Sequence, residues 1–216
     1  SLRKKRMAKD KYDIHSLLYD LAKGTIVALC PFSRLKKVSP YGKEHLKEVL
    51  SYKKGAVIAA NHNGFSDPVI LAQVFWRRRV NFLAGENIMA GFKGAALRNA
   101  GCIKVDRNIF DFQSVKECIS RLSSGKLLII FPEGGISSEG ENALKSGMTV
   151  MAIRAGVDII PVYMEKRKSF FNRKRIIIGK PVTPSGKIPS RSNIEAVTAA
   201  VAAEEHFLRQ WAEAEE

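Results

Sequence analysis

The chain has 216 residues, of which 45% are hydrophobic and 26% charged, which favours one domain with a sizeable core. It carries 36 Lys and Arg against 21 Asp and Glu, and this net charge of +15 predicts an anionic partner such as nucleic acid, an acidic carrier or phospholipid. The three cysteines show neither CxxC nor zinc-finger spacing, so we expect no metal site and a reducing compartment. Because charges are frequent near the start, we expect no secretory signal, and no stretch approaches the roughly 20 apolar residues of a transmembrane helix.

Residues 12–30 have the spacing of an amphipathic helix, with Pro31 at its end and basic clusters on both sides. Such a helix can lie in a lipid interface or pack its apolar face on the domain, and the spacing alone leaves both open. We therefore predict two parts of the chain: a basic amphipathic helical segment over residues 1–37 and an α/β domain over residues 38–216.

After residue 38, short apolar stretches alternate with amphipathic ones. The pattern predicts strands over residues 56–60, 80–84, 103–105, 127–131, 159–164 and 175–178, and helices over residues 68–76, 92–99, 112–123, 144–155 and 193–214. Residues 165–174 are expected to form a basic loop. Strands that alternate with helices are typical of α/β proteins, so we predict a single α/β domain with a mostly parallel central sheet flanked by helices.

Polar residues follow several of these strands, and ligands of open α/β sheets bind where the strands end. In the segment 61–68, Asp67 comes five positions after His62, across a glycine turn. The carboxylate can fold back onto the imidazole, keep one ring nitrogen protonated and leave the other as a base for an alcohol. A polar loop histidine and a helix-capping Asp67 ahead of Pro68 are the alternatives, and Asp67 can serve both roles.

A second group of charged residues surrounds the end of the strand predicted at 103–105. Lys104 and Arg107 offer two positive charges to a phosphate. The alternative is a surface ion pair of Asp106 with Arg107, and the pattern alone favours that alternative.

A third group follows the strand predicted at 127–131. Glu133 can accept a hydrogen bond from a glycerol hydroxyl, and backbone N–H groups near Gly134 can hold an anion, unless the segment is a solvated turn. Lys145 is either another anion contact or an exposed helix lysine. Pro161 interrupts an apolar strand, which predicts a sheet edge or a bulge, and the apolar residues around it form core or a wall for an acyl chain.

The order His-x4-Asp, Gly-x-x-x-Val-Asp-Arg, Phe-Pro-Glu-Gly and Ile-Pro-Val resembles the glycerolipid acyltransferase family, in particular its bacterial 1-acylglycerol-3-phosphate acyltransferases. The resemblance implies that His62 is the general base, that Asp67 orients it, and that Arg107, Glu133 and Gly134 contact phosphate or glycerol. It also implies a glycerol-3-phosphate acyltransferase-like fold, acyl-CoA or acyl-carrier protein as co-substrate with no other cofactor, and the sn-2 hydroxyl of lysophosphatidic acid as acceptor. The product is then phosphatidic acid, made by a peripheral enzyme that its N-terminal segment holds on anionic phospholipid at the cytoplasmic face of the cell membrane.

Two positions depart from the family pattern. Ile136 stands where the family usually has a phosphate-binding arginine, and Lys104 stands where it often has Phe or Pro. Lys104 or Lys145 can supply the missing charge. The alternative is a different acceptor, either another lysolipid or an aminolipid hydroxyl.

The expected mechanism is direct transfer of the acyl group without an acyl-enzyme, and nothing marks Cys102 as an activated nucleophile. Three other functions remain as alternatives. Ser66 lies in a near miss of the hydrolase G-x-S-x-G motif, which lacks the final glycine. The positive charge also suits a nucleic-acid-binding module, although no recognition motif is present and we expect no nucleic-acid partner. A catalytically inactive lipid-binding relative is the third alternative, and the intact His62 and Asp67 argue against it.

Overall fold

The computed structural model describes residues 35–64, 66–85, 89, 94, 97, 98, 100–105, 112–132, 138–166 and 174–215, with the backbone alone at 138–143. The amphipathic helix predicted over residues 12–30 lies outside this part of the chain, and so does most of the helix predicted over residues 92–99.

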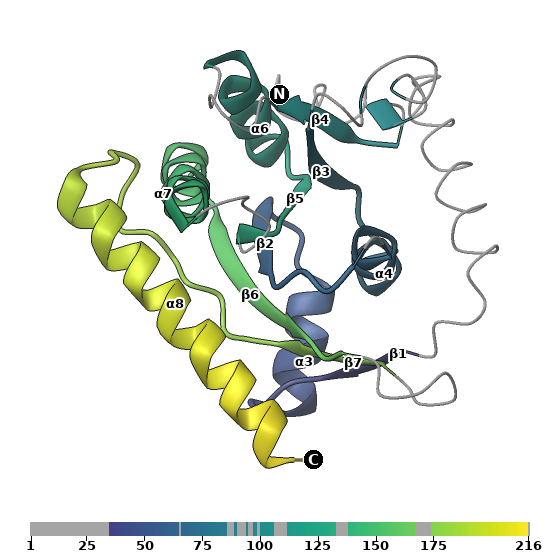
Figure 1. Ribbon diagram of the computed structural model, residues 1–216. Coiled ribbons are helices and arrows are strands. Elements are labelled where there is room, and N and C mark those ends of the chain that lie inside the picture. Colours follow the sequence, from purple (N-terminus) through teal and green to yellow (C-terminus); the bar gives the residue numbers. More distant parts are fainter. Residues whose placement is uncertain are drawn as a thin grey trace, which may run out of the picture.

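The described residues form one seven-stranded sheet in the order β1-β7-β6-β2-β5-β3-β4 (Figure 1). The strands are β1 (Leu35–Val38), β2 (Ala56–Ala60), β3 (Val80–Gly85), β4 (Cys102–Val105), β5 (Leu127–Ile130), β6 (Asp158–Met164) and β7 (Lys174–Ile178). The strands β6, β2, β5, β3 and β4 are parallel, whereas β7 is antiparallel to β6, and β1 is parallel to β7. The predicted mostly parallel α/β fold is therefore confirmed.

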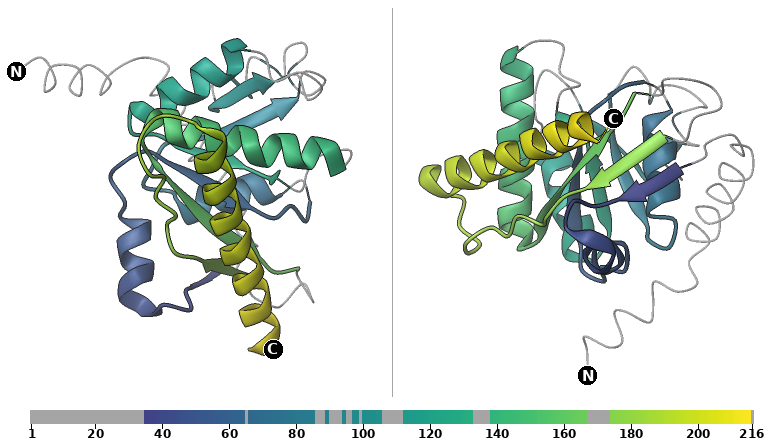
Figure 2. Two further views of the ribbon diagram at one scale, coloured as in Figure 1. Left: turned by 90° about the vertical axis from the view of Figure 1, so that its left-hand side faces the viewer. Right: turned by 90° about the horizontal axis from the view of Figure 1, so that it is seen from below.

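Helices cover both faces of this sheet. They are α3 (Gly42–Leu50), α4 (Asp67–Val74), α6 (Phe112–Ser123), α7 (Ser138–Ala155) and α8 (Arg191–Ala214). One face packs against α3 and α4, and the other against α6, α7 and α8, as the two views of Figure 2 show. The strand β1 and the helix α3 were not predicted, and the expected boundary between residues 37 and 38 falls inside β1.

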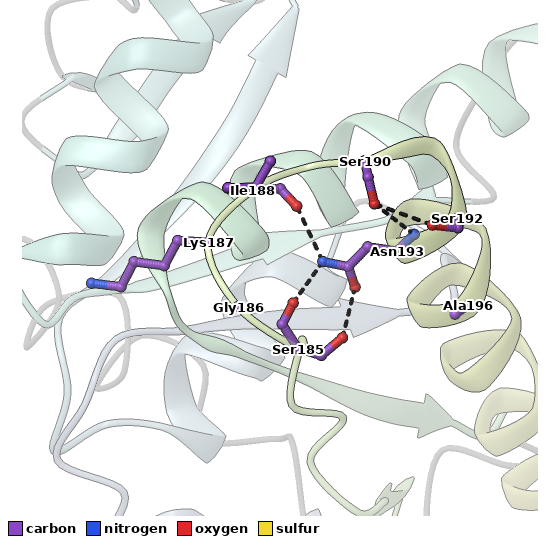
Figure 3. Close-up of a pocket in the computed structure, with 8 residues that line it drawn as sticks. All are labelled: Ser185, Gly186, Lys187, Ile188, Ser190, Ser192, Asn193 and Ala196. Atoms are coloured by element: carbon purple, nitrogen blue, oxygen red, sulfur yellow. Dashed lines mark hydrogen bonds between the residues drawn. The ribbon is translucent and has the colours of Figure 1, made fainter.

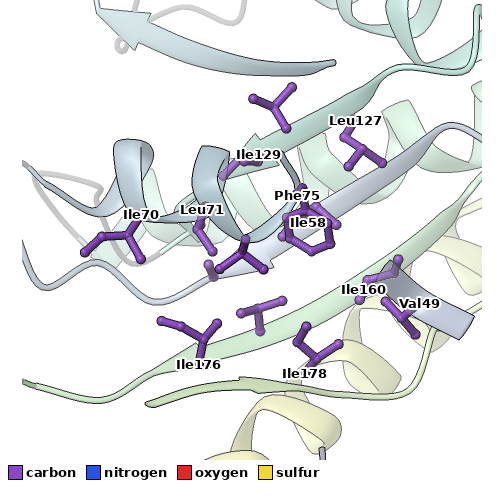
Figure 4. Packing of buried hydrophobic residues seen from close by; sticks show 14 of the residues in the cluster. Val49, Ile58, Ile70, Leu71, Phe75, Leu127, Ile129, Ile160, Ile176 and Ile178 are labelled. Atoms are coloured by element: carbon purple, nitrogen blue, oxygen red, sulfur yellow. The ribbon is translucent and has the colours of Figure 1, made fainter. Parts of the chain in front are cut away.

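The core has two layers because the central strands are covered on both faces. All five residues of β2 are fully buried, with Ile58 in the layer under α3 and α4, and Val57 and Ala59 in the layer under α6, α7 and α8. Figure 4 shows the first layer, in which Ile58 lies among Leu71, Phe75 and Ile160. A strand buried on both sides has no polar face, which is why β2 is an uninterrupted apolar run in the sequence.

Pro161 lies in β6, which is an interior strand and not an edge. Its carbonyl accepts a hydrogen bond of 2.9 Å from Gly179 N–H, so its nitrogen also faces the β7 side. On that side, β7 pairs with residues 162–164, and the next pairing is an isolated bridge between Ile159 and Val182. The missing N–H of proline therefore falls where the ladder is interrupted, as a bulge would place it.

Candidate active site

His62 and Asp67 are in contact at the carboxyl end of β2. The chain leaves β2 at Ala60, turns through residues 61–66 and enters α4, whose first residue is Asp67. Nδ1 of His62 lies 2.9 Å from Oδ2 of Asp67. Because a carboxylate only accepts hydrogen bonds, Nδ1 carries the proton of the neutral ring, and Nε2 is left as an unprotonated base.

The Asp67 carboxylate is aimed at the preceding turn and not at its own helix. Oδ2 also accepts the backbone N–H groups of Asn63 at 2.5 Å and Gly64 at 2.7 Å. The residue that precedes α4 is Ser66, and no side chain caps the first turn of this helix by a hydrogen bond. The helix-capping alternative for Asp67 is therefore not what the structure shows.

Lys174 completes the surroundings of Asp67, and the sequence analysis missed it. Its Nζ lies 2.9 Å from Oδ1, and the side chains of Lys174 and Asp67 are only 9% and 1% exposed. The sequence predicts Lys174 in the basic loop over residues 165–174, but it is the first residue of β7. Because β7 runs antiparallel to β6, its first residue reaches the edge of the sheet where β2 and β6 end. The alternation of Lys174 with Ile176 and Ile178 on the α4 face was the available sequence signal.

The charge on Asp67 is decided by two opposing effects. Burial alone would raise the pKa of this carboxyl group, because it disfavours the charged form. Hydrogen bonds from Lys174, His62 and the backbone N–H groups of Asn63 and Gly64 outweigh burial and hold the pKa of Asp67 below its ordinary value of 3.8. Asp67 is therefore a carboxylate at neutral pH although it is buried.

The imidazole of His62 is held on one face by an aromatic ring. Phe131 directly follows β5, the strand beside β2, and its ring stacks on that of His62 with centroids 4.5 Å apart and planes 24° apart. The His62 side chain is 35% exposed. Since Nδ1 points to the buried carboxylate, the exposed part includes the other side of the ring, where a substrate hydroxyl can approach Nε2.

Two asparagines fasten the turn after β2 to the end of β6. Asn61 donates from Nδ2 to the Met164 carbonyl at 2.9 Å and accepts the Met164 N–H at 2.7 Å. Asn63 donates to the same carbonyl at 2.7 Å. These bonds continue the pairing of β2 with β6 beyond Ala60 and fix the backbone on either side of His62.

The other predicted binding residues are not placed in contact with His62 and Asp67. Lys104 is exposed on β4, which is separated from β2 by β5 and β3 and therefore lies about 14 Å away across the sheet. Lys145 is on α7, on the face of the sheet opposite α4. Arg107, Glu133 and Gly134 lie outside the described residues.

Two candidate nucleophiles lack an activating partner among the described residues. Burial raises the pKa of the Cys102 thiol to about 11, so this residue is a thiol at neutral pH. Ser66 is exposed, and within the described part of the chain no hydrogen bond joins its hydroxyl to His62. A serine hydrolase needs such a bond to activate its nucleophile.

A surface cavity of about 490 Å³ lies between β7 and α8 and is lined by residues 185–188, 190, 192, 193 and 196 (Figure 3). Its polar groups bond to one another: Asn193 Nδ2 donates to the carbonyl of Ser185 at 2.8 Å, and the Asn193 N–H donates to Ser190 Oγ at 3.2 Å. The cavity follows the end of β7, and thus lies at the edge of the sheet opposite His62. Its hydrogen bonds anchor the start of α8, and it contains none of the predicted site residues.

Comparison with known proteins decides the family. Residues 37–165, more than half of the chain, match the family model described as Acyltransferase. The chain belongs to the acyltransferase family. This acyltransferase is 27% identical over 167 residues to the 1-acyl-sn-glycerol-3-phosphate acyltransferase of Bacillus subtilis, a match that covers 74% of this chain and 83% of the relative. It is 26% identical over 163 residues to the protein of the same name from Helicobacter pylori, covering 68% of each chain.

The fold of the acyltransferase matches a solved structure. The crystal structure of the 1-acyl-sn-glycerophosphate (LPA) acyltransferase PlsC from Thermotoga maritima superposes with a TM-score of 0.59 at 20% identity, covering 95% of this chain and 82% of that chain. The family resemblance and the acyltransferase activity class expected from the four sequence blocks are thus confirmed. Within the described ranges, no helix combines the length and apolar character needed to span a bilayer.

Proposed function

We propose that this acyltransferase moves a fatty acyl group from a thioester donor, acyl-CoA or acyl-carrier protein, to the sn-2 hydroxyl of 1-acylglycerol-3-phosphate. The observation that carries the proposal is the 2.9 Å contact of His62 Nδ1 with the buried Asp67, which leaves Nε2 as a base beside solvent. The names of the bacterial relatives support the choice of acceptor. A hydroxyl is too weak an acid to attack a thioester unless a base takes its proton.

In this mechanism, Nε2 of His62 takes the proton as the acceptor oxygen attacks the thioester carbonyl. The ring becomes an imidazolium, and the adjacent Asp67 carboxylate stabilises its charge. The tetrahedral intermediate then collapses, the C–S bond breaks, and the thiolate leaves as a thiol with the proton that His62 returns. The acyl group passes directly to the acceptor, so no covalent acyl-enzyme forms.

A second acceptor class has its own motivation. Ile136 stands where the family resemblance implies a phosphate-binding arginine, so another lysolipid or an aminolipid hydroxyl is the alternative acceptor. The test uses purified full-length protein with labelled acyl-CoA and acyl-carrier protein against a panel of lysolipids that differ in head group. Preferred transfer to 1-acylglycerol-3-phosphate supports the proposal, and preferred transfer to another lipid supports the alternative.

If the acceptor is 1-acylglycerol-3-phosphate, a cation other than an arginine at position 136 must meet its phosphate. Among the described residues, Lys104 and Lys145 are the two cations that the sequence predicts for this role. We predict that Ala substitution of one of the two raises the acceptor KM about tenfold with kcat little changed, because a lost contact to a charged group is worth about 1.5–3 kcal/mol. Exposed Lys36 on β1, changed to Ala, is the control. Unchanged KM in both variants rejects this role.

We further propose that the enzyme is peripheral at the cytoplasmic face of the cell membrane. The net charge of +15 supports attraction to anionic phospholipid, and both the acceptor and the product of the proposed reaction are membrane lipids.

A further inference from the structure

The buried Asp67 carboxylate has two neighbours that can neutralise it. Lys174 donates to Oδ1 and His62 donates to Oδ2, each at 2.9 Å. Asp67 is 1% exposed and Lys174 is 9% exposed, so water supplies little compensation for either charge. A buried anion needs one compensating cation, and here two groups compete for that place.

We propose that Lys174 is the permanent counter-ion of the Asp67 carboxylate, and that it thereby leaves His62 uncharged and able to accept a proton. The inference deepens the proposed acyl transfer and rests on it only for the role of His62 as base. Lys174 acts through Asp67 and is a positioning residue, since its Nζ contacts the carboxylate and not the imidazole.

When Lys174 is neutral or absent, either the Asp67 carboxylate or the His62 ring takes up a proton. An imidazole is ordinarily more basic than a carboxylate by about 2.5 pH units. The N–H groups of Asn63 and Gly64, which bond to Oδ2, further favour the ionised carboxylate. Without Lys174, the proton therefore goes to His62, which becomes the counter-ion of Asp67. An imidazolium cannot accept the proton of an acceptor hydroxyl.

The surroundings of Asp67 offer no other cation within the described residues. The helix α4 carries no charged residue besides Asp67, and the turn over residues 61–64 contributes His62. From β7 come Lys174 and Arg175, but Arg175 lies on the opposite face, where it pairs with Glu165 at 3.1 Å and stacks on Trp211 of α8. The balance of charge at Asp67 thus depends on Lys174 and His62 alone in this part of the chain.

The decisive variant is Lys174→Gln, because it keeps a hydrogen-bond donor for Oδ1 but removes the charge. The readout is ¹⁵N NMR of histidine-labelled protein without substrate, with the His62 signal assigned from a His62→Gln spectrum. We expect the pH at which the His62 ring takes up its second proton to rise by about 1 unit or more. Lys174→Arg keeps the charge and should restore the wild-type midpoint.

The same shift should appear in kinetics. On the acid side of the pH profile of Lys174→Gln, kcat falls about tenfold relative to wild type at a given pH, because a one-unit shift leaves about a tenth of the ring as base. Activity recovers at higher pH, and the acceptor KM is unchanged, which a merely structural defect would not produce. Arg175→Gln is the matched control, since it removes an equally ion-paired cation from the same strand on the opposite face and should leave the midpoint in place.

Several results would overturn the proposal: an unchanged or lowered His62 midpoint in Lys174→Gln, or an equal rise in Arg175→Gln. If Lys174→Gln does not fold, Asp67→Asn is compared with the double variant Asp67→Asn/Lys174→Gln, in which no buried anion remains. Equal midpoints in those two proteins support action through Asp67, and different midpoints refute it. If the His62 midpoint rises in Lys174→Gln but the wild-type protein transfers no acyl group, the proposed function alone is refuted. If the wild-type protein transfers acyl groups but the midpoint does not move, only the role of Lys174 as counter-ion is refuted.

Discussion

At the scale of single residues, the site depends on a carboxylate whose two oxygens accept four hydrogen bonds. Three of them end on Oδ2, from His62 Nδ1 and the N–H groups of Asn63 and Gly64, and the fourth joins Oδ1 to Lys174. Each donor favours the ionised form and fixes the orientation of the group. Substitutions at this cluster therefore separate into those that remove the base and those that disturb a buried charge.

Removal of the base should reduce activity severely and spare the fold. We expect His62→Ala to lower kcat by a factor of about 10²–10⁴, the usual contribution of general base catalysis. The side chain is 35% exposed, so its loss opens no buried cavity, and the melting temperature should change little. Steady-state transfer assays and thermal unfolding measure the two quantities. Exposed His206 on α8, changed to Ala, is the control, and wild-type turnover in His62→Ala would contradict the mechanism.

Removal of the carboxylate should cost stability as well as activity, with a defined dependence on pH. Asp67→Asn leaves Lys174 buried without a counter-ion, which costs about 3–5 kcal/mol at pH 7. Because the pKa of Asp67 is lowered in the folded state, its contribution is present above about pH 4 and is lost as pH falls through the folded value. The difference between wild type and variant should therefore shrink in acid.

Urea unfolding at pH 7 and below pH 4 tests this dependence. Glu195→Gln is the control, because it breaks an exposed ion pair with Arg191 that is worth only about 0–1 kcal/mol. A difference in unfolding free energy between wild type and Asp67→Asn that stays constant down to the lowest pH would show that the carboxylate is not the stabilising form.

At the scale of elements, the turn after β2 is held by its bonds to the end of β6. Asn61 makes two hydrogen bonds with the Met164 backbone, and Asn63 makes a third. A base works only if its ring keeps its place relative to both substrates, and the fixed turn together with the stacked Phe131 provides that. The turn is thus part of the catalytic geometry although it contacts no reacting atom.

Loss of the hydrogen bonds between Asn61 and the Met164 backbone should make the turn more mobile without removing His62 or Asp67. We expect Asn61→Ala to lower the unfolding free energy by about 1–3 kcal/mol, because it leaves the backbone N–H of Met164 without its partner. It should also lower kcat at least as strongly as it raises KM. Hydrogen exchange at residues 61–64 should speed up. Asn193→Ala, which removes a comparably bonded amide at the start of α8, should leave exchange at 61–64 and kcat as in wild type. Unaltered hydrogen exchange at residues 61–64 in Asn61→Ala would show that the bonds from Asn61 to Met164 do not hold the turn in place.

The elements that the sequence predicts well are those with a strong apolar pattern. The bounds of β2 and α6 are as predicted, because β2 is buried on both faces and α6 has a clear amphipathic repeat. The helix α7 begins at Ser138, earlier than the predicted residue 144, since its first turns are polar and contain Gly140. The strand β1 escaped prediction because Lys36 and Lys37 interrupt it and it pairs on one side only.

For the site, sequence spacing predicted the contact within one segment but missed the contact between distant segments. The contact of His62 with Asp67 is local, so the His-x4-Asp spacing predicted it. The contact with Lys174 depends on the reversal of β7 relative to β6, and no local pattern contains that information. Lys104 and Lys145 lie on β4 and α7, and their contact with the phosphate of an acceptor stays a prediction.

At the scale of the whole molecule, charge and family together favour action at a lipid surface. The net charge of +15 belongs to a chain whose first 33 residues alone contain seven Lys or Arg and three Asp, and these residues lie outside the described structure. Basic residues near an anionic bilayer are worth about 1 kcal/mol each. The remaining charge is carried by the residues from 34 onward, so binding has two contributions that can be separated.

Deletion of residues 1–33 should weaken binding to anionic vesicles, because it removes the predicted amphipathic helix and the basic cluster that precedes it. Sedimentation with vesicles of phosphatidylglycerol and phosphatidylcholine, over a series of salt concentrations, measures the change. The residual binding of the shortened protein should disappear with rising salt, since it is electrostatic. Vesicles of phosphatidylcholine alone are the control, and equal binding of both proteins to anionic vesicles rules out the membrane role of the segment.

The antiparallel course of β7 also bears on how this enzyme can be altered. The lysine that neutralises Asp67 comes from a position 107 residues later in the chain, far outside the segment that contains the base. A mutagenesis library confined to residues 61–68 therefore introduces new catalytic groups while the positive charge of Lys174 stays in place. Because Lys174→Gln alone is expected to change the basicity of His62, a library that aims to tune the base has to include position 174.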